Sequence, residues 1–219
     1  MKNLLLFFVA QICMLQMEAQ HFALSNDRMN VAYLGVDNPI SIAVENYPCK
    51  SIVLKVKNGT VDGRNCRYIF RGIEVGVANI TVYKKNGSRL KIIGEYALRV
   101  KRIPPPIVKI GPYGGNYFDN GGKKVEKVIL AAQQFVRADL ENFDFDAKFQ
   151  IVSFSVKIFH ADSCRSEVFH NTTGRISQEI SDAFSGLKEN DVILFNKIFA
   201  FGPDGFQWEL APLILTIDK

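Results

Sequence analysis

Few side chains in this sequence could do chemistry, and those that could form two small groups. The first group joins two imidazoles, a thiol and a carboxylate, which are ordinary ligands of zinc. Its spacing matches no standard zinc motif, and it lies in a polar stretch between a strand pattern and a helix pattern. We therefore interpret it as a solvated loop without metal. Its members are His160, Asp162, Cys164 and His170.

The second group is a pair of carboxylates, Asp144 and Asp146, which lie two residues apart. Paired carboxylates serve acid–base catalysis in glycosidases, and they also bind calcium. Neither the polar and aromatic support of a glycosidase cleft nor further oxygen ligands for calcium accompany this pair. We therefore interpret the segment as a structural turn, with Phe143, Phe145 and Phe149 packed beneath it.

The familiar catalytic motifs are missing from the sequence. It contains no metalloprotease helix motif, no nucleophile elbow and no paired Cys-x-x-Cys. The glycine-rich stretch from Gly111 to Gly122 lacks the Gly-Lys-Ser/Thr ending that cradles phosphates. We predict that the protein is not an enzyme and that it has no catalytic residues, no metal and no cofactor.

The N-terminus has the three regions of a secretory signal. Lys2 precedes an apolar run from Leu4 to Leu15, and a short polar segment follows and ends at Ala19. This run is too short to span a bilayer, and no later window reaches about 18 apolar residues without charges. We predict a signal peptide of residues 1–19 and an exported chain without a membrane span. The location is the periplasm, with outer-membrane association or secretion as variants.

Export to an oxidising compartment makes the cysteines informative. Cys49 and Cys66 are 17 residues apart, and closing that loop would contribute about 3 kcal/mol in the chain-entropy model. They form either a disulfide or two small buried hydrophobes, and both interpretations stay open. Cys164 would then be a free thiol or an intermolecular bridge. A lipidated Cys13 is the rival to signal cleavage, but Ile12 stands where a small residue is wanted.

The mature first half, residues 20–101, consists of short strand patterns separated by turn residues. Asn58-Gly59 and Asp62-Gly63 mark tight turns, and Asn86-Gly87 supplies the positive φ angles of a two-residue hairpin. This pattern predicts an immunoglobulin-like β-sandwich. Its expected strands are Val31–Leu34, Ile40–Val44, Ile52–Val56, Arg67–Phe70, Val77–Tyr83 and Leu90–Val100.

A linker and a second β-rich domain follow. Consecutive prolines in residues 102–106 favour a stiff polyproline path, and residues 107–219 predict a β-rich C-terminal domain with one short helix. Apolar residues at helical spacing place that helix between Thr173 and Leu187. Other expected features are a weaker helix at Val125–Ala132, strands at Gln134–Leu140 and Val152–Ile158 with a bulge near Ile151, and a hairpin of Val192–Phe201 and Phe206–Ile217 interrupted at Pro212.

Composition narrows the function classes. The chain has 219 residues, 47% of them apolar and 22% charged, with a net charge of +5. These values exclude a disordered tail, a collagen and a polytopic membrane protein. Export argues against nucleic acid as the partner of the basic residues. We interpret them as the solvated face of a strand, or as a surface for an acidic partner: Lys84, Lys85, Arg89, Lys91, Arg99, Lys101 and Arg102.

Aromatic residues flank the Gly-Pro-Asp-Gly turn of the last hairpin. At strand spacing they form either part of the core or an exposed anchor for a partner. We take the turn and its flanks as the candidate partner contact: Phe201, Pro203, Asp204, Phe206 and Trp208.

Four segments resemble a known family. They are NVAYLGVDNPI from Asn30, VKRIPPP from Val100, LENFDFDAKFQIVSFSV from Leu140 and FGPDGFQWELAPL from Phe201. Over about residues 30–219 the chain is similar to the C-terminal half of the gliding-motility protein GldM, called PorM in non-gliding relatives. The resemblance implies a periplasmic protein of the type IX secretion and gliding apparatus. Its last two β-rich domains would meet the ring of lipoprotein and partner subunits at the outer membrane.

The resemblance also sets limits. Full-length family members begin with a transmembrane helix that joins an inner-membrane motor, followed by a helical domain and a further β-rich domain. Here a signal peptide is expected to lead almost directly into the penultimate domain, so motor coupling is not carried over. The family offers no catalytic residues. It tends toward dimers, which makes a homodimer possible.

Two functions compete at this point. We expect a non-enzymatic interaction protein that docks onto type IX secretion or gliding components, as an adaptor or a truncated paralogue. The alternative is a secreted or surface β-sandwich that binds glycan or another extracellular ligand. That alternative requires an exposed aromatic platform around Trp208 or in the loop from Tyr113 to Phe118.

Overall fold

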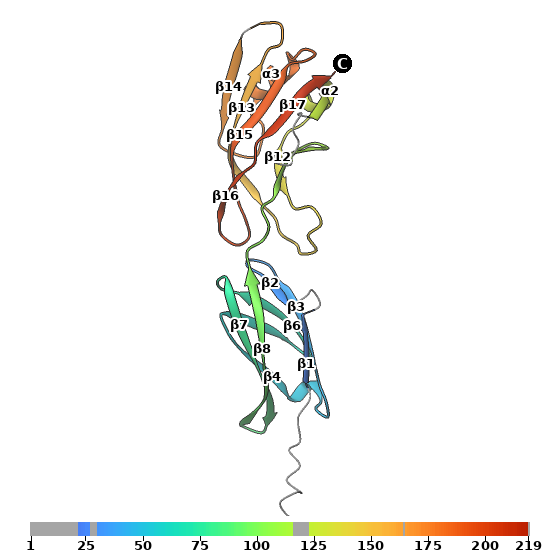
Figure 1. The fold of residues 1–219 in the computed structure, drawn as a ribbon, viewed down its shortest axis with the longest axis vertical. Helices are drawn as coiled ribbons and strands as arrows, with labels where there is room; N and C mark the ends of the chain where they lie inside the picture. Colours follow the sequence, from blue (N-terminus) through green and yellow to red (C-terminus); the bar gives the residue numbers. More distant parts are fainter. Residues whose placement is uncertain (1–21, 27–29, 116–122, 164, 219) are drawn as a thin grey trace, which may run out of the picture.

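Two β-rich units lie end to end along the long axis of the molecule (Figure 1). The computed structural model describes residues 22–26, 30–115, 123–163 and 165–218. The expected signal peptide, residues 1–19, and Cys164 lie outside the described residues. Each unit has its own hydrophobic core, one formed by residues between 32 and 100 and the other by residues between 108 and 217. The predicted fold class, mainly β with an immunoglobulin-like sandwich, is confirmed.

The N-terminal unit, residues 22–101, consists of two four-stranded sheets packed face to face. Ala78, Ile80 and Val82 point into the core between the sheets, as their alternation predicts. One sheet has the order β1 (Phe22–Asn26), β3 (Asn38–Val44), β6 (Arg67–Gly72), β5 (Gly59–Arg64). The other has the order β2 (Val31–Tyr33), β8 (Arg89–Lys101), β7 (Gly76–Asn86), β4 (Ile52–Lys57), and the short 3-10 helix η1 (Cys49–Ser51) precedes β4.

Two strands of this unit are not predicted from the sequence, and one of the expected turns is wrong. At Asn58-Gly59 the chain bends sharply at Asn58, with a φ of 60°, between β4 and β5. Asp62-Gly63 forms no turn, because it lies within β5, whose hairpin with β6 closes at Asn65 and Cys66, both with positive φ. The other unpredicted strand is β1, which pairs with β3. In the β7–β8 hairpin Asn86 pairs with Arg89, so the two-residue loop is residues 87–88 and only its glycine has a positive φ.

A buried asparagine holds the loop between β2 and β3. The Asn38 side chain donates from Nδ2 to the carbonyl oxygens of Tyr33, Val36 and Phe70, and its Oδ1 accepts the Tyr33 N–H at 2.7 Å. Because a buried amide is stable only when its hydrogen bonds are made, the loop is fixed in one conformation. Residues 34–37 therefore form a defined surface at the end of the unit that faces its neighbour.

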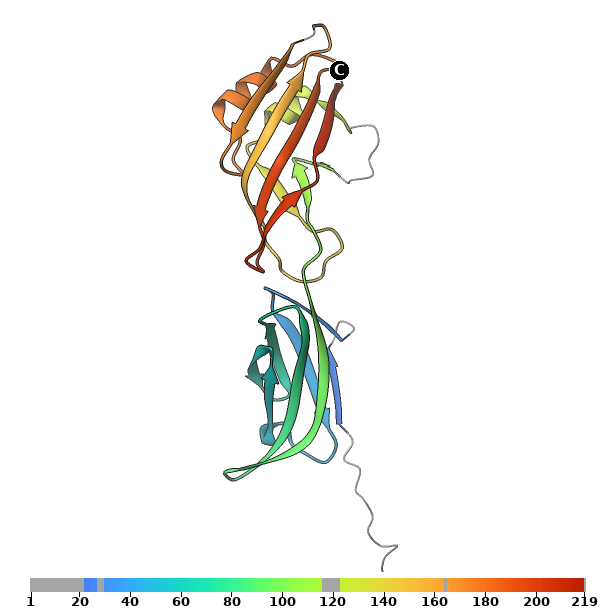
Figure 2. The same cartoon turned by 60° about the vertical axis from the view of Figure 1, so that its left-hand side comes forward.

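The C-terminal unit, residues 107–218, has a six-stranded and a three-stranded sheet with two short helices in the described residues. The large sheet has the order β11 (Lys123–Glu126), β17 (Leu213–Asp218), β15 (Val192–Phe201), β13 (Gln150–Phe159), β14 (Ser166–Asn171), with β16 (Gln207–Leu210) also paired to β15. The small sheet has the order β10 (Tyr113–Gly114), β9 (Ile107–Ile110), β12 (Val136–Asp139). The helices α2 (Lys127–Ala131) and α3 (Gln178–Ser185) lie behind the large sheet (Figure 2).

The helix prediction agrees best where the apolar stripe is longest. Ile180 and Phe184 of α3 are buried, and the ring of Phe184 packs on Phe195 of the large sheet at 6.2 Å. Ser177 caps the helix by accepting the Ile180 N–H at 3.4 Å. The second helix, α2, is shorter than its expected range, because Val125 belongs to β11.

Irregularities in the large sheet lie near the predicted places. The β13–β15 register shifts on either side of Ser153, next to the bulge expected near Ile151. On β15, Lys197 has a φ of 47°, and the buried residues change parity there. Pro212 separates β16 from β17, which explains the opposite parity of the apolar residues before and after it.

Candidate functional site

The Gly-Pro-Asp-Gly turn between β15 and β16 is closed by its own hydrogen bonds. The Gly202 N–H donates to the Phe206 carbonyl at 3.0 Å, and the Gly205 N–H donates to the Gly202 carbonyl at 3.1 Å. Asp204 Oδ1 accepts the Phe206 N–H at 3.2 Å. Gly205 has a φ of 73°, which favours glycine at this position. The local sequence thus determines the shape of the turn.

This turn contacts the N-terminal unit directly. Gly35, in the loop held by Asn38, lies so close that an added Cβ would be 2.4 Å from the Asp204 backbone nitrogen. The Asp204 side chain has an exposed fraction of 0%, and its Oδ2 lies 3.8 Å from an Arg102 guanidinium nitrogen. The same guanidinium lies 3.7 Å from the centroid of the Phe206 ring. Arg102, Asp204 and Phe206 therefore connect the linker to the turn.

A second contact between the units is aromatic. The ring of Tyr33, at the end of β2, meets Phe143 and Phe145 at centroid distances of 4.9 and 5.3 Å. The two phenylalanines expected beneath the Asp144 and Asp146 turn thus reach the other unit, and Phe149 packs against the C-terminal core. We call these contacts, together with the Gly35 and Arg102 contacts, the junction.

The predicted linker is partly enclosed. Ile103 and Pro106 are buried, whereas Pro104 and Pro105 are exposed. Burial of one side of the proline segment means that it lies against protein rather than crossing open solvent.

The five candidate contact residues divide into two groups. Pro203 and Asp204 face the N-terminal unit, and Trp208 packs against the C-terminal core, with an enclosed Nε1 that has no hydrogen-bond partner in the described residues. Phe201 and Phe206 keep exposed fractions of 44% and 50%. Sequence spacing suggests one surface for all five, but only the two phenylalanines present a large apolar area to solvent.

The first group of potential metal ligands is separated by the fold. His160 Nδ1 lies 3.2 Å from Asp191 Oδ2, and its Nε2 lies 3.2 Å from Glu167 Oε1. His170 is bonded elsewhere, with Nδ1 2.9 Å from Ser155 Oγ. The segment is not a solvated loop throughout, because residues 166–171 form β14. Within the described part of the chain no group of three or more His, Cys, Asp or Glu side chains is arranged to hold a metal ion.

Asp191 was not predicted from the sequence, yet it organises this end of the sheet. Its buried carboxylate accepts the backbone N–H groups of Ala161 at 2.9 Å and Lys188 at 3.0 Å. Burial alone would raise the pKa of Asp191, but these donors and the adjacent His160 outweigh burial and lower the pKa below its ordinary value. The carboxylate stabilises two loops.

The carboxylate pair Asp144 and Asp146 shows no arrangement for catalysis. Asp146 forms an exposed ion pair with Lys148 at 4.0 Å. A hollow of the C-terminal unit, about 590 Å³ in volume, lies between β12 and the start of β13 and is lined by neither residue. Its polar lining combines Arg137, Asp139 and Arg175 with threonines, without a nucleophile and base in hydrogen-bond contact.

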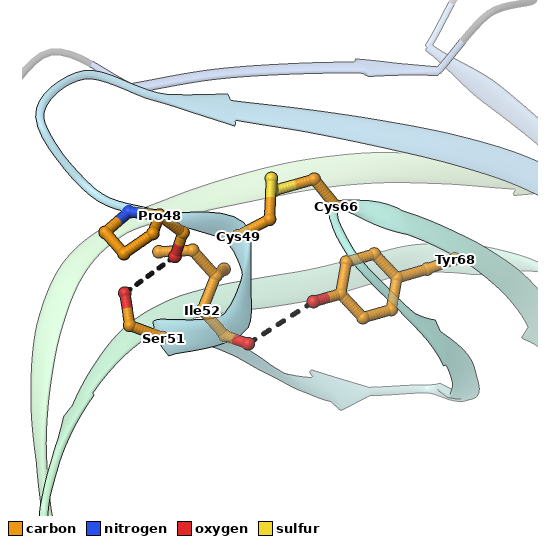
Figure 3. The surroundings of a disulfide bond; sticks show 6 residues. All are labelled: Pro48, Cys49, Ser51, Ile52, Cys66 and Tyr68. Atoms are coloured by element: carbon orange, nitrogen blue, oxygen red, sulfur yellow. Dashed lines mark hydrogen bonds between the residues drawn. A yellow bond between two sulfur atoms is a disulfide. The ribbon is translucent and has the colours of Figure 1, made fainter.

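A disulfide joins Cys49 to Cys66, with Cα atoms 5.2 Å apart (Figure 3). It ties η1, which leads into one sheet, to the β5–β6 turn of the other. Beside it the Tyr68 hydroxyl donates to the Ile52 carbonyl at 3.3 Å, again linking the two sheets. The bond thus closes the end of the N-terminal unit that lies away from the junction.

No helix in the described residues is both long and apolar enough to cross a membrane.

Comparison with known proteins gives weak structural likenesses. No curated protein matches the sequence. The adhesin InvE of Yersinia pseudotuberculosis is 11% identical, with a TM-score of 0.30 over 92% of this chain and 59% of that one. A beta-glucuronidase 3 of Bacteroides uniformis is 12% identical, with a TM-score of 0.29 over 93% and 25%. The four N-terminal Ig domains of Dscam1 isoform 8.4 are 10% identical, with a TM-score of 0.24 over 90% and 51%. The chain spans less than two thirds of the length of each of these proteins.

Family models match almost the whole described chain. The model of the GldM third domain matches residues 22–101, and the model of the GldM C-terminal domain matches residues 104–218. The third-domain match precedes the C-terminal-domain match along the chain, and the boundary between them lies at the proline segment. Since they cover both β-rich units, the chain belongs to the GldM family.

Proposed function

We propose that this chain is a non-enzymatic, exported protein that docks from the periplasm onto the outer-membrane-associated ring of the type IX secretion and gliding machinery. The observation that carries the proposal is the match of both β-rich units to consecutive GldM domains. GldM domains are components of that machinery.

The absence of catalytic chemistry is part of the proposal. In the described residues the titratable side chains with shifted pKa values are engaged in ion pairs or hydrogen bonds of the fold, as Asp191 is with Ala161 and Lys188. Perturbed groups of an active site normally converge in a cleft. Here the hollow beside β12 is lined by none of them, and a hollow of the N-terminal unit is lined by Tyr68 alone among them.

We assign the partner contact to the exposed aromatic rings at the Gly-Pro-Asp-Gly turn. Phe201 is the last residue of β15 and Phe206 directly precedes β16, and exposed aromatic side chains are frequent anchors of protein interfaces. Because the turn is closed and held against Gly35, these rings are presented on a rigid support, which lowers the ordering cost of binding.

Affinity purification from the native envelope under mild extraction tests the proposal. The tagged chain is expected to retain subunits of the secretion ring, and Phe201→Ser to reduce their recovery about tenfold, as truncation of an interface anchor does. Phe159→Ser is the matched control, because Phe159 lies at the other end of the same sheet with 39% exposure against 44% for Phe201.

Recovery of no ring subunit with the unmodified chain would refute the docking function. Equal losses in the two variants would leave docking in place but move the contact away from the turn. A homodimer, which we include in the proposal, is tested separately by light scattering of the purified chain.

Glycan binding is not proposed, because the structure does not favour it. Both Trp208 and Tyr113 pack against the C-terminal core, so the exposed rings near Trp208 are those of Phe201 and Phe206, which we assign to the protein partner. Residues 116–118 of the other candidate platform lie outside the described residues.

A further inference from the structure

The β7–β8 hairpin extends beyond the core of the N-terminal unit. Its register shifts between Val82 and Tyr83, and the buried residues of β7 end at Val82. The part beyond this point, residues 83–92, reaches the end of the molecule opposite the C-terminal unit (Figures 1 and 2). We call residues 83–92 the hairpin tip.

The hairpin tip carries a concentration of positive charge that the fold does not use. Lys84 lies over the Tyr47 ring at 4.3 Å, but Lys85, Arg89 and Lys91 form no ion pair within the part of the chain that the structure describes. Lys84 is directly opposite Lys91 in the register. Like charges in this position destabilise a hairpin, so folding alone does not explain them.

Aliphatic side chains lie among these charges and are also unused by the fold. Leu90 and Ile92 have exposed fractions of 39% and 55%. Leu90 is opposite Lys85 and Ile92 is opposite Tyr83, and alternation along the strands places these four side chains on one face. This face therefore combines two aliphatic side chains, one aromatic ring and one lysine, and the opposite face of the hairpin carries Lys84, Arg89 and Lys91.

We propose that the hairpin tip binds an anionic phospholipid surface. Clustered lysines and arginines are attracted to anionic headgroups, and exposed aliphatic side chains beside them enter the headgroup boundary while the lysines stay in water. The tip is at one end of the long axis, so a planar surface can reach it without touching the C-terminal unit. An acidic protein would use the charges but would leave two protruding aliphatic side chains without a defined role. The site is separate from the partner contact at Phe201 and Phe206.

Vesicle co-sedimentation of the mature full chain tests this inference. We expect binding to vesicles of phosphatidylglycerol and phosphatidylethanolamine, no binding to pure phosphatidylcholine, and weaker binding when salt rises from about 0.05 M to about 0.5 M. Because each basic residue near an anionic surface is worth about fivefold in partitioning, the triple variant Lys85→Gln, Arg89→Gln, Lys91→Gln is expected to lose about 100-fold. Leu90→Ser with Ile92→Ser is expected to weaken binding at both salt concentrations.

The matched control is Arg99→Gln, Lys101→Gln, Lys127→Gln, which removes three exposed positive charges far from the hairpin tip. It is expected to bind within about threefold of the unmodified chain. Circular dichroism melting confirms that each variant is folded. The inference is overturned if the unmodified chain does not bind anionic vesicles, or if both triple variants lose vesicle binding equally. It is also overturned if the chain fails to bind vesicles but captures an acidic protein through the hairpin tip.

Discussion

Gly35 and Gly205 both have left-handed backbone conformations, with φ angles of 80° and 73°, but they meet different surroundings. A Cβ at Gly205 would have no neighbour within 4 Å, whereas one at Gly35 would overlap the backbone of Pro203 and Asp204. The same residue type thus serves local turn geometry at one position and contact between two units at the other. Sequence spacing cannot distinguish these roles, because the neighbour of Gly35 is far along the chain.

This difference gives a prediction with an internal control. Gly205→Ala is expected to lower the free energy of unfolding by about 1 kcal/mol, because alanine is strained in the left-handed conformation. Gly35→Ala adds a backbone overlap to the same strain, so it is expected to cost at least about 2 kcal/mol or to separate the units. Urea unfolding and solution scattering measure the two effects. Equal behaviour of the two variants would contradict close packing at Gly35.

Asp191 gives a pH-dependent prediction at the same scale. The pKa of Asp191 in the folded chain lies below its ordinary value. The carboxylate therefore stabilises the folded chain above about pH 4, and this stabilisation is lost as pH falls through the folded pKa. Both carboxylate oxygens accept backbone N–H groups, and an amide would turn a donor toward one of them. Asp191→Asn is therefore expected to lower the free energy of unfolding by about 2 kcal/mol near pH 7 and by less near pH 3.

Unfolding in urea at the two pH values measures this loss, with the exposed Asp146→Asn as control. A loss that is independent of pH would show that the carboxylate charge has no part in it.

At the scale of elements, prediction succeeded where one face of an element is buried over several turns or residues. Apolar residues recur with the period of a strand in Val77–Tyr83 and with the period of a helix in α3, so the buried face can be predicted from the local sequence. Strand β5 was missed because its glycines and aspartate have low strand propensity, and its pairing with β6 overrides that preference. Strand β14 was missed for a similar reason, since its polar residues are half exposed at the edge of the sheet.

The disulfide acts between elements, because it joins the two sheets at η1 and the β5–β6 turn. Replacing both Cys49 and Cys66 by serine is expected to lower the free energy of unfolding by about 3 kcal/mol, the closure of a loop of 17 residues. Urea unfolding of the oxidised chain, of the reduced chain and of the double variant measures it. The last two should agree, and a double variant as stable as the oxidised chain would contradict the prediction.

For the whole molecule, the junction determines how the two units are presented to partners. Tyr33 against two phenylalanines, Gly35 against the turn, and Arg102 between Asp204 and Phe206 all lie around the proline segment. A linker supported on several sides should hold the units in one arrangement, whereas prolines alone would act only as a semi-rigid spacer. The phenylalanines proposed for docking would then have a fixed position relative to the hairpin tip at the far end.

Solution scattering tests this arrangement. The unmodified mature chain is expected to give a narrow distribution of distances, and Tyr33→Ala with Arg102→Ala to broaden it without unfolding either unit. Lys101→Ala, an exposed neighbour outside the junction, is the control and is expected to leave the distribution unchanged. A broad distribution for the unmodified chain would refute the fixed arrangement.

The sequence by itself determined what depends on neighbouring residues: the β class, the sandwich core around Ala78, Ile80 and Val82, the α3 stripe, the break at Pro212 and the family. Only the tertiary structure decided which side chains meet across long separations. It placed Asp204 against Arg102, separated His160 from His170, and left Leu90 and Ile92 exposed beside unpaired lysines. The physical reason is that periodicity reports which face of an element is buried, whereas contacts between elements depend on how the faces are assembled.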